Sequence, residues 1–415
     1  MLPFKHFIPK LSTKYCQFKK NKHSVIENLN KMYAPIRFDA LDINPYPLLF
    51  NKQLVYQIND CHSLLIEAIH QIVTHFFSDS ALRQIISLND QTLNLLHPLK
   101  DKPYEIGAIR PDFLFDKTYQ LKICEINARF PMNAFILSQC IYDEIVKNFV
   151  DKISCLHKKM IKNFEILNQF FDYTQPIYIL FDKEKSFDIF LLKNIWEKTL
   201  PNLKLKLMTP PECLFKNKFL DQRRNRFQGI LNLHQEELLT LEPSLFNEIT
   251  AQTYFNDIRT ILIVHDKRLL SVLSNKTIMS RYISSEKYNR LATYIIPTYS
   301  LNDNTIENIK VNPKNWVLKK ISAGKGEGMT IGKETPLAKF STVLNEKKLD
   351  YIAQPFIEQP LFQLLNGSCT YQALYLVGTI LSFNNILVGP GLLRGSHKTI
   401  INIAQGDTTI FTPFY

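Results

Sequence analysis

Three side chains that carry oxygen atoms are spaced so that a β-hairpin could bring them together. Glu125 and Asn127 are two residues apart in a stretch that alternates apolar and polar residues, so on a strand both would project from one face. Asp112 lies on the segment before them. With a turn at residues 116–119, Asp112 would face Ile123 and lie diagonal to Glu125, at about 7–8 Å between α-carbons.

This set of side chains suits magnesium. Mg²⁺ takes oxygen ligands and is often held by a few carboxylates together with substrate phosphates. The sequence therefore predicts a magnesium site on Asp112, Glu125 and Asn127. A purely structural hairpin is the alternative, because an Asp before a strand and a Glu-x-Asn within one also occur where no metal binds.

Composition indicates an ordinary globular protein. The chain has 415 residues, 45% of them hydrophobic and 21% charged, which is enough for two or three domains. It has neither a transmembrane run of about eighteen apolar residues nor the apolar core of a signal peptide, so we expect a cytoplasmic protein outside the membrane. Its seven scattered cysteines never form Cys-x-x-Cys, which disfavours a disulfide framework and a zinc site.

The net charge of +12 indicates anionic partners. The basic residues are dispersed among acidic ones, without a helix-turn-helix, zinc-finger or aromatic RNA-binding signature, so nucleic acid is a disfavoured partner. Nucleotide phosphates are the preferred anions, especially for the lysines at residues 319–325.

Hydrophobic periodicity predicts the main helices. A helix is expected over residues 61–77 with Asp60 as its N-cap, and one or two helices over residues 135–171. The first forty residues are basic and show little periodicity, and they are expected either to form an arm or to pack on a neighbouring domain. Residues 297–313 are polar and are expected to be a connection.

A small α/β domain is predicted where short apolar runs alternate with helical segments. The runs lie at 177–182, 204–208 and 229–233, and the helices at 186–199 and after the third run. The continuous apolar run at 260–266 is expected to be a buried parallel strand. The predicted domains are a helical part with the hairpin (1–172), the small α/β substrate domain (173–266), and a nucleotide-binding region with a glycine-rich loop (267–415).

A strand ending in lysines precedes the glycine-rich loop. Residues 316–320 run toward Gly324, Gly326 and Gly328, whose backbone amides could approach phosphate oxygens while Lys319 supplies a positive charge. This is not a Walker loop, which needs Gly-Lys-Ser or Gly-Lys-Thr at a helix start. A simple glycine-containing β-turn is the alternative.

Two later segments complete the nucleotide-binding pattern. The apolar strand that begins at residue 351 breaks at a proline, which could free backbone groups to read an adenine edge; an ordinary edge strand is the alternative. The residues concerned are Gln354, Pro355, Phe356 and Glu358. Arg394 follows a flexible stretch at 388–391 and could hold a carboxylate or phosphoryl group, with a surface salt bridge as the alternative.

Together these motifs resemble the ATP-grasp carboxylate–amine ligases, in the branch that contains eukaryotic glutathione synthetase and glutathionylspermidine synthetase. Ordinary members place the metal-binding Glu-x-Asn after the lysine strand and glycine loop, whereas this branch is permuted and places it before them, as here. The resemblance covers about residues 105–140 and 260–415. The matching hairpin residues are Arg110, Asp112, Phe113, Leu121, Lys122, Glu125 and Asn127.

The resemblance implies an α/β ATP-grasp fold in permuted order, with ATP and Mg²⁺ as cofactors. It implies magnesium ligation by Asp112, Glu125 and Asn127, and substrate contact by Arg110. It makes Lys276 and Lys319 the pair that holds phosphates. Gln354 to Glu358 would contact adenine, and Arg394 would belong to the terminal substrate-binding segment.

We therefore expect an ATP-dependent ligase that joins a small-molecule carboxylate and an amine through an acyl phosphate, with Arg394 and Arg110 as catalytic residues. A ligase acting on a peptide or protein carboxylate is one alternative. A catalytically degenerate nucleotide-binding protein is another, because Ala323 stands where the family usually has a metal-binding Glu. Ser396 replaces a basic residue of glutathione synthetase, so glutathione need not be the product. A homodimer is compatible with the sequence.

Overall fold

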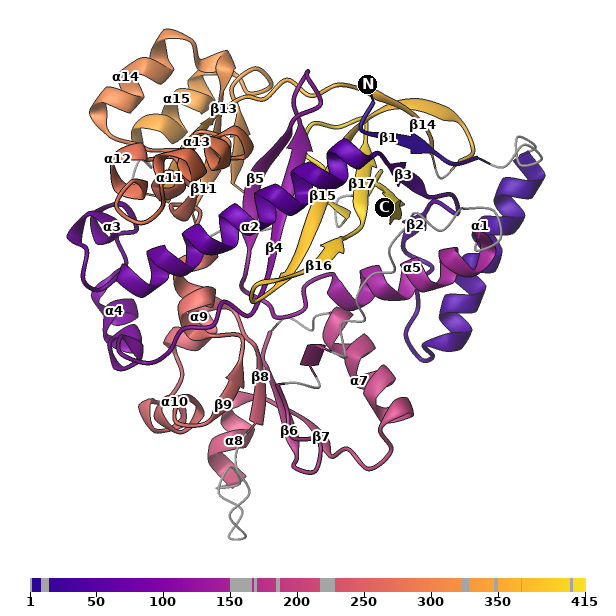
Figure 1. The fold of residues 1–415 in the computed structure, drawn as a ribbon, viewed down its shortest axis with the longest axis horizontal. Helices are drawn as coiled ribbons and strands as arrows, with labels where there is room; N and C mark the ends of the chain where they lie inside the picture. Colours follow the sequence, from indigo (N-terminus) through magenta and orange to yellow (C-terminus); the bar gives the residue numbers. More distant parts are fainter. Residues whose placement is uncertain are drawn as a thin grey trace.

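The computed structural model describes residues 2–8, 15–149, 166–167, 170–183, 187–216, 228–321, 328–346, 350–366, 368–403 and 406–415. These residues form four β-sheets with helices packed around them, which confirms the predicted mixed α/β class (Figure 1). The largest sheet lies at the centre of the molecule. The predicted domain boundaries at 172/173 and 266/267 remain predictions.

The central sheet has the strand order β2-β18-β17-β15-β4-β5, and β14 and β16 also pair with β15. Its strands are β2 (Asp42–Ile43), β4 (Ala108–Phe115), β5 (Leu121–Asn127), β14 (Phe362–Leu365), β15 (Tyr371–Phe383), β16 (Ile386–Pro390), β17 (Leu393–Ser396) and β18 (Thr409–Phe411). The hairpin predicted around residues 109–127 is confirmed as β4 and β5. The stretch expected to be flexible near 388–391 is instead largely the ordered strand β16.

A second, antiparallel sheet carries the lysine strand, in the order β10-β13-β11-β12. Its strands are β10 (Tyr299–Ser300), β11 (Trp316–Lys320), β12 (Met329–Ile331) and β13 (Tyr351–Pro355), with α14 (Asp303–Val311) and α15 (Leu337–Glu346) packed nearby. The predicted strands at 316–320 and 351–355 are confirmed. The prediction that residues 297–313 form a polar connection is wrong, because most of this stretch is α14. Asn302 starts that helix and accepts a hydrogen bond from the Thr305 backbone N–H.

The predicted small α/β unit is a four-stranded parallel sheet with the order β7-β6-β8-β9. It comprises β6 (Ile177–Phe181), α7 (Phe187–Thr199), β7 (Leu205–Met208), α8 (Pro210–Lys216), β8 (Gln228–Asn232), α9 (Gln235–Leu239), α10 (Pro243–Thr250) and β9 (Thr253–Phe255). The strand expected at 260–266 is wrong. Thr260–Val264 forms a buried π-helical turn. A continuous apolar run is buried on all sides in either conformation, so its pattern could not distinguish them.

Helix α2 (Lys52–His75) crosses one face of the central sheet (Figure 1). The prediction of a helix over 61–77 with Asp60 as its N-cap is wrong about the start. Asn51 is the cap and accepts a hydrogen bond from the Leu54 backbone, while Asp60 lies inside the helix and pairs with Arg290. Leu54 and Ile58, which are buried two turns and one turn before the predicted start, were the periodic signal that the prediction overlooked.

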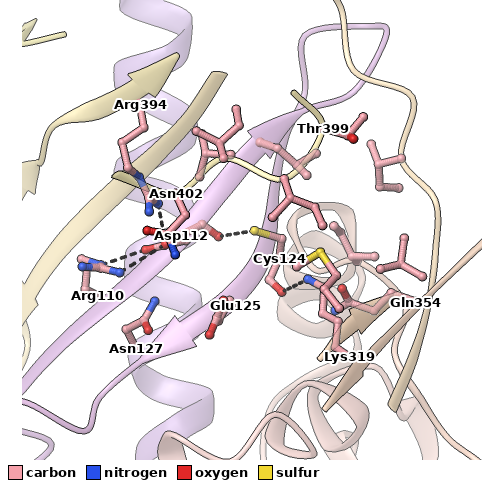
Figure 2. Close-up of a pocket in the computed structure, with 18 of the residues that line it drawn as sticks. Arg110, Asp112, Cys124, Glu125, Asn127, Lys319, Gln354, Arg394, Thr399 and Asn402 are labelled. Carbon is pink, nitrogen blue, oxygen red and sulfur yellow. Dashed lines mark hydrogen bonds and ion pairs between the residues drawn. The ribbon is translucent and has the colours of Figure 1, made fainter. Parts of the chain in front are cut away.

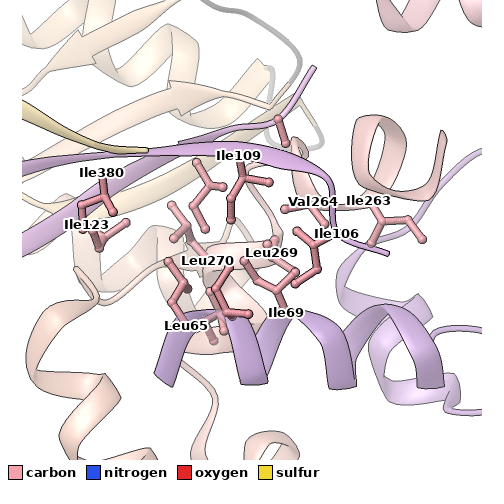
Figure 3. Packing of buried hydrophobic residues seen from close by; sticks show 14 of the residues in the cluster. Leu65, Ile69, Ile106, Ile109, Ile123, Ile263, Val264, Leu269, Leu270 and Ile380 are labelled. Atoms are coloured by element: carbon pink, nitrogen blue, oxygen red, sulfur yellow. The ribbon is translucent and has the colours of Figure 1, made fainter. Parts of the chain in front are cut away.

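The core under the hairpin joins three parts of the chain (Figure 3). Its members come from α2, from the central sheet, and from the π-helical turn with α11 (Leu269–Leu273): Leu65, Ile69, Ile109, Ile123, Ile263, Val264, Leu269, Leu270 and Ile380. Burial of such side chains stabilises a fold by about 1.5–3 kcal/mol each. This packing fixes the hairpin from the side opposite the pocket described below.

The basic N-terminal segment packs against the rest of the molecule, which agrees with the second of the two expectations for it and not with an arm. It contains α1 (Tyr15–Met32), whose Phe18, Val25 and Leu29 are buried in the same apolar cluster as residues of α5 (Phe135–Phe149). The remaining predicted helical residues at 150–165 lie outside the described part of the chain. The helical signal that the prediction overlooked is the spacing of Phe18, Val25 and Leu29, which are seven and four positions apart.

The remaining elements are short. They are β1 (Phe4–His6), β3 (Leu48–Phe50), β19 (Pro413–Phe414), α3 (Ser80–Ile85), α4 (Asp90–Leu96), η1 (His97–Leu99), α12 (Lys276–Met279), α13 (Ser285–Tyr294) and η3 (Pro313–Asn315). Strands β1, β3 and β19 form a three-stranded sheet. Among the described helices, none combines the length and apolar character needed to cross a membrane.

Close packing at Gly378 fixes β4 against β15. A β-carbon there would lie 2.3 Å from the Phe113 ring, so Gly378→Ala should displace that ring. We expect the free energy of unfolding in urea to fall by about 1–3 kcal/mol. Gln372→Ala, at an exposed position of the same strand, is the control and should change it by less than about 0.5 kcal/mol. Equal stabilities of the two variants would contradict this packing.

Asp188 of α7 holds the start of α5, because its carboxylate accepts hydrogen bonds from the backbone N–H groups of Ala134 (2.7 Å) and Leu137 (2.8 Å). Burial raises the pKa of Asp188 to about 6, although these hydrogen bonds and Arg110 favour the charged form. The folded pKa lies above the unfolded value, so the protonated group adds stability at low pH, and this contribution disappears as the pH rises from about 4 to 6.

Asp188→Asn removes this titration. We expect wild type to lose up to about 3 kcal/mol of unfolding free energy relative to the variant between pH 4 and pH 7. Urea denaturation of both proteins at pH 4, 5, 6 and 7 measures the difference. Parallel stability curves would show that the carboxyl of Asp188 does not titrate in this range.

Candidate active site

The β4–β5 hairpin contains a β-bulge where the site begins. Phe113 pairs with Ile123, but Asp112, the preceding residue of β4, pairs with Glu125, so Cys124 is an extra residue on β5. The predicted pairing of Asp112 with Ile123 is therefore wrong, and Asp112 lies opposite Glu125 rather than diagonal to it. The prediction failed because nothing in the sequence around Cys124 marks a bulge.

The hairpin forms one wall of a pocket of about 310 Å³ (Figure 2). That volume lies within the usual range for small-molecule sites. The predicted site residues that line it are Arg110, Asp112, Glu125, Asn127, Lys319, Gln354, Pro355, Phe356 and Arg394. The structure therefore brings residues from β4, β5, β11, β13 and β17 to one place.

Asp112 is held between two arginines. Arg110 donates from Nε to Oδ1 (2.9 Å) and from Nη2 to Oδ2 (3.3 Å), and Arg394 donates from Nη2 to Oδ2 (2.6 Å). Burial alone would raise the pKa of Asp112, but the two guanidinium groups outweigh it and lower the pKa. Arg110 also donates to Asn133 Oδ1 at 3.0 Å. Arg394 is thus part of a buried network rather than a surface salt bridge.

The bulge also positions the strand lysine. Lys319 Nζ donates to the Cys124 carbonyl oxygen at 3.0 Å, and the lysine is only 7% exposed. The Cys124 thiol donates to the Asp112 carbonyl oxygen at 3.3 Å. Burial raises the pKa of Cys124 to about 11, so its sulfur is a neutral thiol and a poor nucleophile near neutral pH.

Lys267 is a site residue that the sequence pattern did not reveal. Its Nζ lies 3.5 Å from Glu125 Oε1, and the residue is buried. No local pattern marked it, because His265 and Asp266 separate Lys267 from the apolar run, and its approach to Glu125 depends on how separate segments pack. Two further residues were missed, Arg129 and His265, both of which line the pocket.

His265 is uncharged in the folded protein. Its Nδ1 accepts a hydrogen bond from the Ala128 backbone N–H at 3.3 Å. Burial, followed by the nearby positive charges of Lys267 and Arg129, lowers its pKa well below the usual value. Within the described part of the chain, the ionised lining residues are consequently four cations, Arg110, Arg129, Lys319 and Arg394, and two carboxylates, Asp112 and Glu125. This excess of positive charge favours an anionic ligand.

The opposite wall is the end of β13. The Gln354 side chain is buried at the pocket wall and donates to Thr298 Oγ1 at 2.9 Å, a contact that supports the strand. The Phe356 backbone N–H donates to the Asn315 carbonyl at 2.7 Å. Within the described residues, Glu358 is absent from the pocket lining and pairs with Lys117.

Other predicted residues lie elsewhere. Gly324, Gly326 and Ala323 fall outside the described residues, whereas Gly328 has φ +68°, a left-handed conformation that suits glycine. Lys276 is exposed at the first position of α12 and is not one of the described residues that line the pocket. The structure thus does not bring Lys276 to the hairpin.

The three predicted magnesium ligands are not equally available to a metal ion. Glu125 and Asn127 offer a carboxylate and an amide oxygen on one strand, which suits Mg²⁺. Both oxygens of Asp112 accept hydrogen bonds from guanidinium groups. The described residues contain no cluster of three His, Cys, Asp or Glu side chains able to hold a metal, so the fit rests on the Glu125–Asn127 pair.

Comparison with known proteins identifies ATP-grasp relatives. The family model described as the AnkG N-terminal domain matches residues 61–263. The chain is 21% identical, over 439 aligned residues, to the ATP-grasp enzyme ankG of Aspergillus thermomutatus, covering 92% of this chain and 89% of that protein.

A solved structure has the same fold. The glutathione synthetase-like effector of Globodera pallida, solved in its apo form, matches with a TM-score of 0.62 and 13% sequence identity, over 99% of this chain and 100% of that chain. The likeness confirms the expected fold class. This chain therefore has a glutathione synthetase-like ATP-grasp fold and is similar in sequence to an ATP-grasp enzyme.

Proposed function

We propose that this protein is an ATP-dependent carboxylate–amine ligase of the permuted ATP-grasp type. It forms an amide bond between a small carboxylic acid and an amine through an acyl phosphate, and it releases ADP and phosphate. The similarity to an ATP-grasp enzyme supports enzyme status, and the position of the hairpin before the lysine strand in the chain supports the permuted order.

One observation carries the proposal: a single pocket joins the lysine strand to the hairpin and to Arg394. Lys319 bonds to the bulge carbonyl of β5, and Arg394 bonds to Asp112 of β4. These residues are far apart in sequence, so chance proximity of the three predicted motifs is a poor explanation. A nucleotide phosphate, a metal and a carboxylate can therefore meet in one place.

The nucleotide is assigned to the side of the pocket that β11 and the end of β13 line. Val317, Met329 and Phe356 provide apolar surface for a purine ring. Lys319 and Lys267 lie near the hairpin, where their ammonium groups would hold phosphate oxygens. Glu125 and Asn127 would hold Mg²⁺, which when bound offsets charge on the phosphates.

The acid is assigned to the arginine side. Its carboxylate oxygen attacks the γ-phosphorus and ADP leaves, which gives an acyl phosphate. The amine nitrogen then attacks the carbonyl carbon, loses a proton and expels phosphate. Arg110 and Arg394 hold the carboxylate and stabilise the charge that develops on its oxygens. No nucleophilic side chain is required, in agreement with the neutral thiol of Cys124.

The proposal is tested by ADP release in a screen of small acids and amines with Mg²⁺ and ATP. We expect turnover that requires both an acid and an amine, and a loss of about 100-fold or more in Glu125→Gln and in Lys319→Met. Glu358→Gln, which changes a carboxylate outside the pocket, is the control and should retain activity.

Unchanged turnover in both site variants would show that the chemistry occurs elsewhere. Saturable ATP binding without turnover in any combination would indicate a nucleotide-binding protein that has lost catalysis. Turnover only with a peptide or protein acid would keep the reaction and change the substrate class.

The structure favours Lys267 over Lys276 as the partner of Lys319. We expect Lys267→Met to weaken MgATP binding about tenfold or more, because the charge is buried beside Glu125. Lys276→Met should change it less than twofold, because Lys276 is exposed at the start of α12. Titration calorimetry with MgATP measures both. A larger loss of MgATP binding in Lys276→Met than in Lys267→Met would show that Lys276 is the partner of Lys319.

A further inference from the structure

Asp112 and Glu125 face each other across the hairpin but meet different cations. Three guanidinium N–H groups approach the two oxygens of Asp112 at 2.6–3.3 Å, from Arg110 and Arg394. Among the residues that the structure describes, Glu125 pairs with the ammonium of Lys267, at 3.5 Å. Paired positions of the same hairpin thus have different electrostatic surroundings.

The surroundings of Asp112 are unfavourable for a metal ion. A cation would compete with Arg110 and Arg394 for the same two oxygens and would be repelled by both guanidinium groups. Releasing the arginines would leave two buried charges without their counter-ion, which typically costs several kcal/mol. Asp112 is 5% exposed, so solvent would compensate little of that cost.

The same contacts suit an orienting role. Arg110 is fixed at both ends, because its Nε and Nη2 donate to Asp112 while Nη1 donates to Asn133. Arg394 is bonded to Asp112 through Nη2, and its buried Nε has no acceptor among the described residues. The carboxylate thus brings together two cations that would otherwise repel each other.

We propose that Asp112 is a positioning residue that orients Arg110 and Arg394 as a pair for the carboxylate of the acid, and that the metal is left to Glu125 and Asn127. This inference rests on the proposed ligase function. The three charged groups together carry a net charge of +1, so one bound carboxylate neutralises them.

The test compares Asp112→Asn with Glu125→Gln, the same carboxylate-to-amide change at opposed positions. The probe is Mn²⁺ with a non-hydrolysable ATP analogue, and binding to the full chain is followed by water-proton relaxation. We expect Glu125→Gln to weaken binding of the complex about tenfold or more, and Asp112→Asn to weaken it less than threefold. Equal weakening in both variants would overturn the inference and make Asp112 a metal ligand.

This comparison separates the inference from the function on which it rests. No weakening in Glu125→Gln would contradict the metal site of the proposed function itself. The second readout uses the acid found in the ADP screen: Asp112→Asn should raise KM for the acid at least tenfold and KM for MgATP less than threefold. A rise of equal size in both constants would indicate a merely structural role and overturn the proposal.

Arg394→Gln protects the test against misfolding of Asp112→Asn. If Asp112 acts through the arginines, Asp112→Asn should raise KM for the acid by a smaller factor in the Arg394→Gln background than in wild type, because only Arg110 then remains to be positioned. Effects that multiply in the double variant would show that Asp112 acts independently of Arg394. Thermal unfolding of each variant shows which are folded and fit for comparison.

Discussion

The pairing of β4 with β5 through one extra residue is the constraint on which the site depends. In a regular ladder, the pairing of Phe113 with Ile123 would place Cys124 opposite Asp112. The bulge places Glu125 there instead, and its Cys124 carbonyl accepts the hydrogen bond of Lys319. Because Lys319 belongs to another sheet, this contact also joins the β11 side of the pocket, where we propose the nucleotide, to the hairpin.

The same strand pairing places the two carboxylates of the hairpin, Asp112 and Glu125, beside different cations. Asp112 is buried and requires a cation, since an unpaired buried charge costs several kcal/mol, and Glu125 is half-buried beside a buried lysine. Asp112 takes its cations from β4 and β17, whereas Glu125 takes Lys267 from the segment after the π-helical turn. One side of the hairpin is therefore suited to a substrate carboxylate and the other to phosphates and a metal.

Local patterns predicted much of this arrangement. Alternation identified the hairpin, short apolar runs identified the strands β11 and β13, and the strand–helix alternation identified the parallel sheet. The apolar run that forms the π-helical turn was misassigned, because burial on every side erases periodicity. Helices α1 and α14 were missed in polar segments, although Asn302 is a recognisable helix cap.

The site itself was predictable in composition but not in geometry. Asp112, Glu125, Lys319 and Arg394 were selected from their types and spacing, and the structure brings them together. The bulge and the approach of Lys267 to Glu125 depend on how separate segments pack, which one sequence does not encode in any local pattern.

The central claim is that one pocket holds the nucleotide phosphates beside the hairpin. A crystal structure with Mg²⁺ and a non-hydrolysable ATP analogue tests it most directly. The account predicts the purine against Phe356, the phosphates between Lys319 and β5, and Mg²⁺ on Glu125 and Asn127. An analogue bound away from this pocket, or phosphates distant from Glu125 at full occupancy, would contradict it.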